Sequence, residues 1–273
     1  MIFESKHQAR ADIKGKVLQG FFAIILVSIF TFFATYLVEL INPFPTPIPV
    51  MGQNFWEQAD AYSPEFLPGT IFNLVTSIGL SFFFVSVLSI GLNNFFIRNH
   101  QGKELDVISS LFMGFKLKYR LILKTLFAVI VALAIYIVPL YAMMVAGLLF
   151  AFTAPILGAI ISVLVLVGFI FLIIKALDYV LVTFLLADDD VVFESPKEYL
   201  EASKQMMKGY KFEFILLGFT FILWFFASVF TFFLLLIWLL PYVYQSYANF
   251  YLNLKPKPQL ENEELEIENV ISE

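Results

Sequence analysis

The sequence predicts an all-α, polytopic membrane protein, and three observations lead to this fold class. Of 273 residues, 60% are apolar, whereas soluble domains have about 45 to 50%. Only 14% are charged, and the mean hydropathy is +0.85. Several runs without charge reach the length of about 20 residues that a helix needs to cross a bilayer. A soluble enzyme, a disordered chain and a nucleic-acid binder all need a larger polar surface, so these classes are excluded.

Six spans follow from the distribution of charge. About 50 residues between Thr125 and Ile174 carry no charge, and one helix of that length would exceed twice the bilayer thickness. We therefore expect a reversal between Phe150 and Gly158. The apolar run that ends at Leu254 also implies two spans, with a turn at 227–231. The expected spans are 17–41, 71–97, 121–149, 157–187, 212–228 and 231–252.

Lys and Arg define the orientation, because cytoplasmic loops retain them. They occur in 1–16, 94–124, 188–213 and the tail, whereas 42–70 has none. Both termini are therefore expected in the cytoplasm. No small-residue cleavage site follows the first span, which predicts an anchor and not a signal peptide.

The expected domains are a cytoplasmic amphipathic segment at 1–16, a transmembrane domain at 17–254 and an acidic, disordered tail at 255–273. The alternating prolines of 42–70 favour an extended outer connection, with a lid or receptor surface as the alternative. For the tail, the alternative is partner binding through a short motif.

A short pattern recurs along the chain. Gly114-Phe115-Lys116 precedes the third span and Gly209-Tyr210-Lys211 precedes the fifth, each after a polar stretch with helical spacing. A fainter copy surrounds Gly15. This pattern predicts an internal repeat of three parallel units, each a cytoplasmic amphipathic helix, a glycine and a transmembrane hairpin.

The third amphipathic helix has the clearest signals. Ser195 and Glu198 form a capping-box pattern around Pro196, and Gly209 is expected to stop the helix. We expect either an interfacial helix on the cytoplasmic leaflet or a docking face for a partner. The residues of this candidate docking face are Tyr199, Ser203, Met206 and Tyr210.

Two spans contain unusual polar residues. Lys175 and Asp178 lie three residues apart, and each ionised group costs about 2.5 to 3.5 kcal/mol near the centre of a membrane helix. They predict either a polar pathway or a local ion pair, with snorkelling of Lys175 to the headgroups as a further alternative. In the sixth span, Gln245 and Asn249 predict a cavity lining, or hydrogen bonds between helices within a tyrosine-rich belt. Lys175, Asp178, Gln245 and Asn249 form the candidate intramembrane site.

The chain offers little for catalysis. It has no Cys and two His, which excludes thiol chemistry and leaves too few ligands for a His-rich metal centre. Asp188, Asp189 and Asp190 lack calcium-loop spacing, so a solvated turn is expected there. We find no set of nucleophile, base and orienting group. The sequence predicts no enzyme, no metal site and no cofactor.

The C-terminal third, 168–254, resembles a known family. The segments that carry this resemblance are Ala176-Leu177-Asp178-Tyr179, Ser203-Lys204-Gln205-Met206-Met207-Lys208-Gly209, Leu240-Pro241-Tyr242 and Asn249-Phe250-Tyr251. They resemble the bacterial integral-membrane family called domain of unknown function nine-seven-five. More distantly, the chain looks like the membrane domain of some glycerophosphodiester phosphodiesterases. The resemblance implies six spans in a bacterial cytoplasmic membrane and transfers no catalytic residue.

The leading hypothesis is therefore a non-catalytic membrane scaffold or accessory subunit. Its partners would be the lipid bilayer and a cytoplasmic or membrane protein, and no nucleic acid. The alternative is a transporter of small solutes or lipids, with a polar pathway near Lys175 and Asp178.

Overall fold

The computed structural model describes residues 1–44, 67–103, 106–116 and 119–255. All regular secondary structure in these ranges is helical, which confirms the all-α class. Most of the expected outer connection at 42–70, and the tail after Lys255, lie outside the described residues.

Five helical segments of the described chain are long and apolar enough to cross a membrane, so the protein is a multi-pass membrane protein. The 3₁₀ turn η3 and the short helix α10 continue the fourth segment. The five segments are α2 (Val17–Ile41), α4–η2–α5 (Leu67–Leu80, Ser81–Val85, Ser86–His100), α8 (Tyr119–Thr153), α9–η3–α10 (Pro155–Ala176, Leu177–Tyr179, Val182–Ala187) and α12 (Lys211–Phe230).

Helix α13 (Leu236–Leu254) occupies the position of the sixth expected span but is not among these five. It contains Gln245 and Asn249 besides several tyrosines, and these lower its hydropathy. The number of six spans is therefore not established by helix length and composition.

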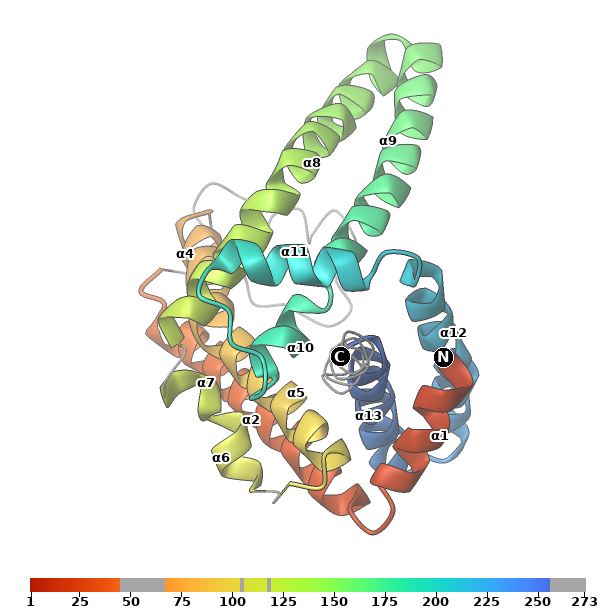
Figure 1. Ribbon diagram of the computed structural model, residues 1–273. Helices are drawn as coiled ribbons and strands as arrows, with labels where there is room; N and C mark the ends of the chain where they lie inside the picture. Colours follow the sequence, from red (N-terminus) through yellow and green to blue (C-terminus); the bar gives the residue numbers. More distant parts are fainter. Residues whose placement is uncertain (45–66, 104–105, 117–118, 256–273) are drawn as a thin grey trace.

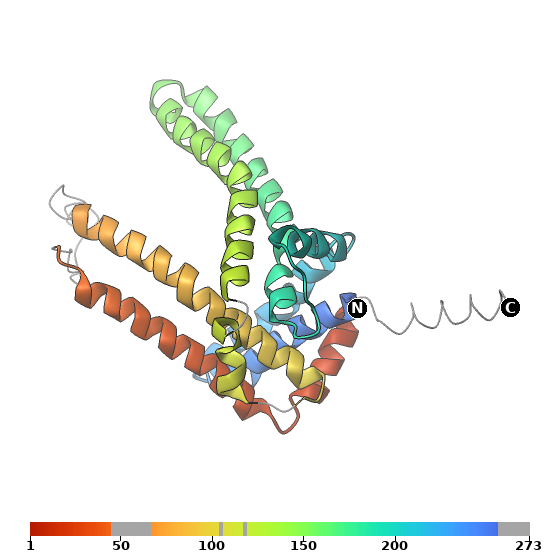
Figure 2. The same ribbon diagram turned by 60° about the vertical axis from the view of Figure 1, so that its left-hand side comes forward.

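The long helices pair as neighbours along the chain. Helix α2 packs against α4, α8 against α9, and α12 against α13. Figures 1 and 2 show that the α8–α9 hairpin leans away from α2 and α4, and that the hairpins approach one another at one end. The short helices α1 (Ile2–Asp12), α6 (Val107–Leu111), α7 (Met113–Lys116) and α11 (Pro196–Met206) lie at this end.

The reversal between α8 and α9 lies inside the expected interval. One residue, Ala154, separates the two helices, and Pro155 begins α9 with its fixed φ. A Cβ on Gly158 would lie 2.7 Å from the Cα of Ala151. Glycine therefore lets the two backbones approach closely near the tip, as small residues do between membrane helices.

The turn between α12 and α13 lies later than the expected 227–231. Helix α12 continues to Phe230, and the chain reverses through Phe232 and Phe233, whose φ values are +49° and +64°. The N–H of Phe233 donates to the carbonyl of Ser228 at 2.8 Å and closes the helix end. Because neither glycine nor proline marks this left-handed turn, the sequence pattern misplaced it.

The glycines of the repeated pattern differ in conformation. Gly15 and Gly209 have φ values of +77° and +90° and link a short helix to a long one. Gly114 lies inside α7, where a Cβ would meet the side chain of Val87 at 2.7 Å. The fainter pattern around Gly15 thus has the same left-handed glycine turn as the pattern at Gly209. The pattern at Gly114, which matches the one at Gly209 better in sequence, does not have this turn.

Each amphipathic helix packs mainly against a hairpin other than the one it precedes. Helix α1 contacts α12 and α13, α6 contacts α2 and α5, and α11 contacts α8, η3 and α10. Lys6 of α1 donates to the Thr220 hydroxyl of α12 at 3.0 Å, and Asn253 of α13 donates to Ser5 of α1 at 3.1 Å. The helix before the first hairpin thus packs on the third hairpin, the helix before the second packs on the first, and the helix before the third packs on the second. This cyclic packing connects the three hairpins.

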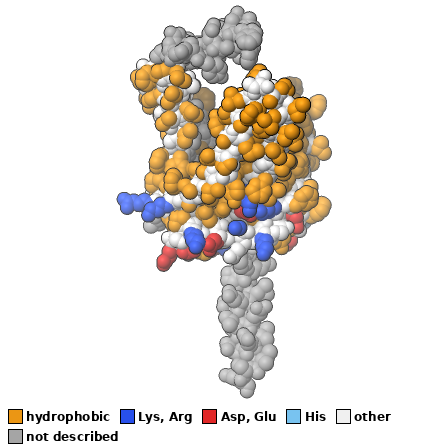
Figure 3. All heavy atoms as spheres, turned by 90° about the horizontal axis from the view of Figure 1, so that it is seen from above, with side chains coloured by type: hydrophobic (Ala, Val, Ile, Leu, Met, Phe, Trp, Pro, Cys, Tyr) orange, Lys and Arg blue, Asp and Glu red, His pale blue; other side chains and the backbone are white. Residues whose placement is uncertain are grey.

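The buried core lies at this same end. Its largest fully buried side chains include Tyr199, Tyr242, Tyr251, Phe95, Phe96, Phe221 and Phe250. By contrast, α8 and α9 expose Leu, Ile, Val and Phe along most of their length. Figure 3 shows a face covered by hydrophobic side chains, with the visible charges gathered at one end. We call this end the charged end.

Candidate functional site

A network of amide side chains joins three helices at the charged end. Asn99 at the end of α5 donates to the Gln245 side-chain oxygen at 2.7 Å, and Gln245 donates to Asn249 at 2.9 Å. Asn249 donates to the carboxylate of Asp12 at 2.7 Å, and His100 approaches the same carboxylate oxygen at 2.8 Å. Asn99, Gln245 and Asn249 are buried. Because their hydrogen bonds are made internally, the network acts as a structural junction between α1, α5 and α13.

The three consecutive aspartates form a second junction. Asp188 is 1% exposed and accepts hydrogen bonds from the Tyr251 hydroxyl at 2.8 Å and from Lys255 at 2.7 Å. Its other oxygen accepts from the Asp190 N–H at 3.0 Å. The expectation of a solvated turn is therefore wrong for Asp188, because the end of α13 covers its carboxylate and supplies a cation.

The two following aspartates connect to α5 and the segment after it. Asp190 accepts from Lys103 at 3.1 Å, and this hydrogen bond lowers the pKa of Asp190 below its ordinary value. Asp189 accepts from Asn94 at 3.2 Å, and Asn94 also donates to the Ala187 carbonyl at 2.6 Å. The aspartate run thus fixes the end of α10 against α5.

Lys175 and Asp178 each interact with a different partner. Asp178 forms its ion pair with Lys211, at the start of α12, and is 5% exposed. The ammonium of Lys175 instead lies over the rings of Phe171 and Tyr136, 5.5 and 6.0 Å from their centroids. The expectation of a local Lys175–Asp178 ion pair is therefore wrong: Lys211 holds the Asp178 carboxylate, and the α-helix ends at Ala176, between Lys175 and Asp178.

Lys175 and Asp178 also lie closer to the charged end than the expected intramembrane site implies. Helix α9 alone has 22 residues, or about 33 Å, which is enough to cross a bilayer core. Lys175 stands in its last turn. The ion pair of Asp178 with the first residue of α12 then lies at the charged end. Of the candidate intramembrane residues, the structure joins Gln245 to Asn249 and joins neither to Lys175 or Asp178.

The expected docking face of α11 is only partly accessible. Tyr199 and Ser203 are fully buried, and Ser203 donates to the Asp178 carbonyl at 2.8 Å. Burial raises the pKa of Tyr199. These two residues hold α11 against the bundle, so they do not offer a surface to a partner. The two residues of the expected capping box do interact, since the Ser195 hydroxyl donates to the Glu198 carboxylate at 2.6 Å. The Ser195 hydroxyl does not accept a hydrogen bond from a backbone N–H of the helix, as a capping box would require.

Met206 and Tyr210 line an open pocket of about 600 Å³ at the charged end. The remaining lining comes from α10, the segment before α11, α11 itself and the end of α13: Leu185, Val191, Phe193, Ala202, Gln205, Asn253, Leu254 and Lys255. Half of the expected docking face therefore borders a hollow that a partner can reach.

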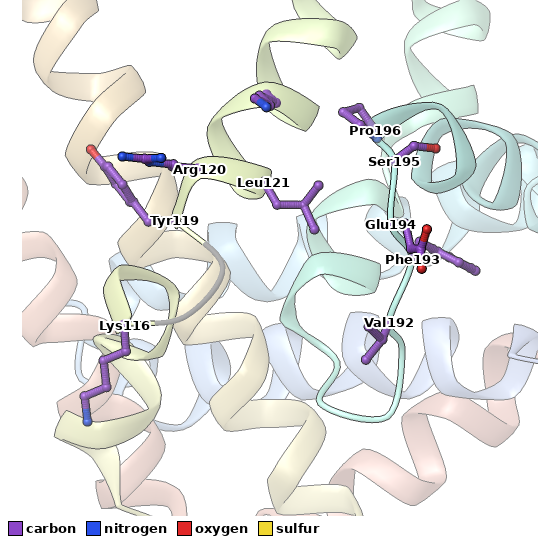
Figure 4. A pocket seen from close by; sticks show the side chains of 10 residues that line it. Lys116, Tyr119, Arg120, Leu121, Val192, Phe193, Glu194, Ser195 and Pro196 are labelled. Carbon is purple, nitrogen blue, oxygen red and sulfur yellow. The ribbon is translucent and has the colours of Figure 1, made fainter.

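A second pocket, of about 840 Å³, lies between α8 and the segment before α11 (Figure 4). Lys116, Arg120 and Lys124 line it together with Tyr119 and Leu121 on one side. The other side consists of 192–196. This basic pocket was not predicted, although the spacing of four residues between its cations was a readable signal.

The aspartates described above and His100 are engaged with other side chains. Among the described residues, no group of three His, Asp or Glu side chains could hold a metal ion. Asp12, Asp178, Asp188 and Asp190 each have a cationic, amide or hydroxyl partner. This arrangement suits the fixing of helix ends.

Comparison with family models identifies the family of this chain. The model of the family described as protein of unknown function DUF975 matches residues 2–257, which include every described helix. No curated protein and no solved structure matches the chain. The more distant likeness to a phosphodiesterase-associated membrane domain stays a prediction. The chain, with its helical bundle joined at a charged end, belongs to the DUF975 family of proteins of unknown function.

Proposed function

We propose that this chain is a non-catalytic membrane scaffold or accessory subunit of a bacterial cytoplasmic membrane. In this proposal it has six spans in three hairpins, with the charged end and both termini in the cytoplasm. The observation that carries it is the double junction at the charged end. There, Asp12 and Asp188 use their carboxylates to bind Asn249 and Lys255, at 2.7 Å each. Such a junction supports a rigid platform better than a reacting site.

The cyclic packing of the amphipathic helices supports the three-unit organisation. Helix α1 packs on the third hairpin, α6 on the first and α11 on the second. A repeat of three equivalent units would produce this order, and the left-handed Gly15 and Gly209 fit it. The Lys and Arg residues of the charged end support a cytoplasmic location.

The pocket beside Met206 and Tyr210 supports a docking role. It combines apolar walls with the polar ends of Gln205, Asn253 and Lys255. Met adapts its shape to different partners because it is unbranched. Lys255 also stands directly before the acidic segment 256–273 in the sequence.

Affinity purification in mild detergent tests the scaffold. We expect a partner to be recovered with the wild type and lost from a Met206→Glu, Tyr210→Glu double variant. Phe3→Glu is the control, because Phe3 is 90% exposed on α1 and lies outside the pocket. Support further requires that the purified partner binds the wild type at least about tenfold more tightly than the double variant, a difference of about 1.4 kcal/mol. Recovery of the lone protein, with no cellular effect of the double variant or of deleting 256–273, would refute the scaffold.

A transporter is the second candidate, and the break between α9 and α10 favours it. Interrupted membrane helices often surround binding sites in transporters, and Asp178 lies within this break. A liposome flux assay with candidate solutes and a fluorescent lipid would compare the wild type with Asp178→Asn and Lys175→Ala. The scaffold predicts equal background flux in all three proteins. Flux by the wild type that Asp178→Asn abolishes would favour the transporter.

A further inference from the structure

The basic pocket beside α8 contains cations that the fold does not use. Lys116, Arg120 and Lys124 are exposed, and none of them forms an ion pair with a described residue. Other cations at the charged end are engaged: Lys103 with Asp190, Lys211 with Asp178, and Lys255 with Asp188.

One acid opposes these three cations. Glu194 lies on the far side of the pocket, and it leaves an excess of two positive charges among the lining residues. Figure 4 shows Leu121 pointing toward the segment 192–196, while the charged ends of Lys116 and Arg120 extend outward, away from that segment. The rim is thus basic, and Leu121, Val192 and Phe193 supply apolar surface beside it.

The pocket lies where a bilayer would begin. Lys124 is the last charged residue before the apolar run 125–174. Arg120 precedes it by one helical turn, or about 6 Å along α8. Arg120 and Lys124 lie on one side of α8. When α8 crosses the membrane, their charged groups are at the depth of the lipid phosphates.

Above the cations, α8 offers an apolar path. Phe127, Ile130 and Ile135 are 60%, 53% and 69% exposed. Below them, the Tyr119 hydroxyl donates to the Phe83 carbonyl of the π-helical turn η2 at 3.1 Å, which anchors the start of α8. A ligand with a phosphate and acyl chains would match both the basic rim and the apolar path.

We propose that this pocket binds a phosphate group, supplied by the headgroup of an anionic phospholipid. Arg120 and Lys124 contact the phosphate oxygens, since a guanidinium can donate two parallel hydrogen bonds to them. Lys116 adds attraction at the rim, and the acyl chains lie along α8. Free phosphate is the other source of the same chemistry.

Native mass spectrometry of the delipidated full-length protein tests this site with phosphatidylglycerol, phosphatidylcholine and inorganic phosphate as probes. The pocket variant is K116Q/R120Q/K124Q. The matched control is K14Q/K204Q/K208Q, which removes the same charge from three exposed lysines that do not line the pocket. Each cation near an anionic lipid contributes about 1 kcal/mol, so we expect phosphatidylglycerol binding to weaken at least tenfold in the pocket variant and less than threefold in the control.

R120K keeps the charge but loses the guanidinium fork, so an intermediate loss is expected. Phosphatidylglycerol binding that millimolar inorganic phosphate does not displace assigns the site to lipid. Binding of inorganic phosphate that only the pocket variant loses assigns it to free phosphate. Equal losses in the pocket and control variants, or preference for phosphatidylcholine, would overturn the proposal. An unchanged thermal midpoint of the pocket variant shows that loss of binding is not unfolding.

Discussion

The α8–α9 hairpin and the charged end differ in the side chains that they expose and bury. The hairpin has an apolar surface that the protein leaves largely exposed, and its two helices mainly contact each other. The charged end buries Asn99, Gln245 and Asp188 in paired hydrogen bonds. In a bilayer, apolar contact alone distinguishes poorly between a helix and lipid. Polar junctions therefore specify how the helices of this protein meet.

The largest expected effect comes from removing Asp188. Asp188→Ala leaves the ammonium of Lys255 and the hydroxyl of Tyr251 without their shared partner at a buried position. We expect a loss of about 3 to 5 kcal/mol in unfolding free energy, measured by denaturation in mixed detergent micelles. Asp189→Ala, with a side chain that is 38% exposed, should cost less than about 1 kcal/mol. Equal losses would contradict the role of Asp188 as a junction.

The next effect contrasts two leucines. Leu186 in α10 is fully buried, and Leu166 in α9 is 63% exposed. Leu186→Ala should cost about 2 to 4 kcal/mol because it leaves a cavity. Leu166→Ala should change stability by less than about 0.5 kcal/mol. If Leu166→Ala were as damaging in the same denaturation assay, another surface would have to cover the hairpin.

A smaller effect is expected within the hairpin. Gly158→Val places atoms against the Ala151 backbone, where even a Cβ would lie 2.7 Å away. We expect a cost of about 1 to 3 kcal/mol, together with easier proteolysis near 154. Gly79→Ala is the control, because no atom lies within 4 Å of the added Cβ. The charged end should stay intact, which binding to the partner or to phosphatidylglycerol would report.

The smallest effect is a dependence on pH. The Lys103 hydrogen bond lowers the folded-state pKa of Asp190 below its ordinary value of 3.8. Its contribution is complete above pH 3.8 and is lost as the pH falls through the lower folded value. Because the pair is partly exposed, it contributes less than about 1 kcal/mol. Thermal midpoints between pH 6 and pH 3 should fall less in Asp190→Asn than in the wild type, and high salt should reduce the difference.

The sequence predicted those features that depend on residues close together in the chain. Charge-free length predicted α2 at 17–41, and Pro155 marked the reversal after α8. A missing helix breaker explains the misplaced turn before α13. The i, i+3 spacing suggested a Lys175–Asp178 pair, but the pattern could not show that the helix ends between them.

The junctions could not be predicted from local patterns. Asp12 and Asn249 are 237 residues apart, and Asp188 and Lys255 are 67 apart. Their pairing depends on the convergence of helix ends, which no spacing in the sequence records. The basic pocket is intermediate, since Arg120 and Lys124 follow helical spacing on α8, whereas the place of Lys116 at the end of α7 and the opposite wall at 192–196 required the structure.

The cyclic packing of the amphipathic helices bears on the order of assembly during synthesis. Helix α1 is made first, yet its binding surface on α12 and α13 is made last. At about 5 to 20 residues per second, more than ten seconds separate the two. The cyclic packing of the amphipathic helices can therefore be completed only after the last hairpin has left the ribosome. The docking of α1 on α12 and α13 is its final step.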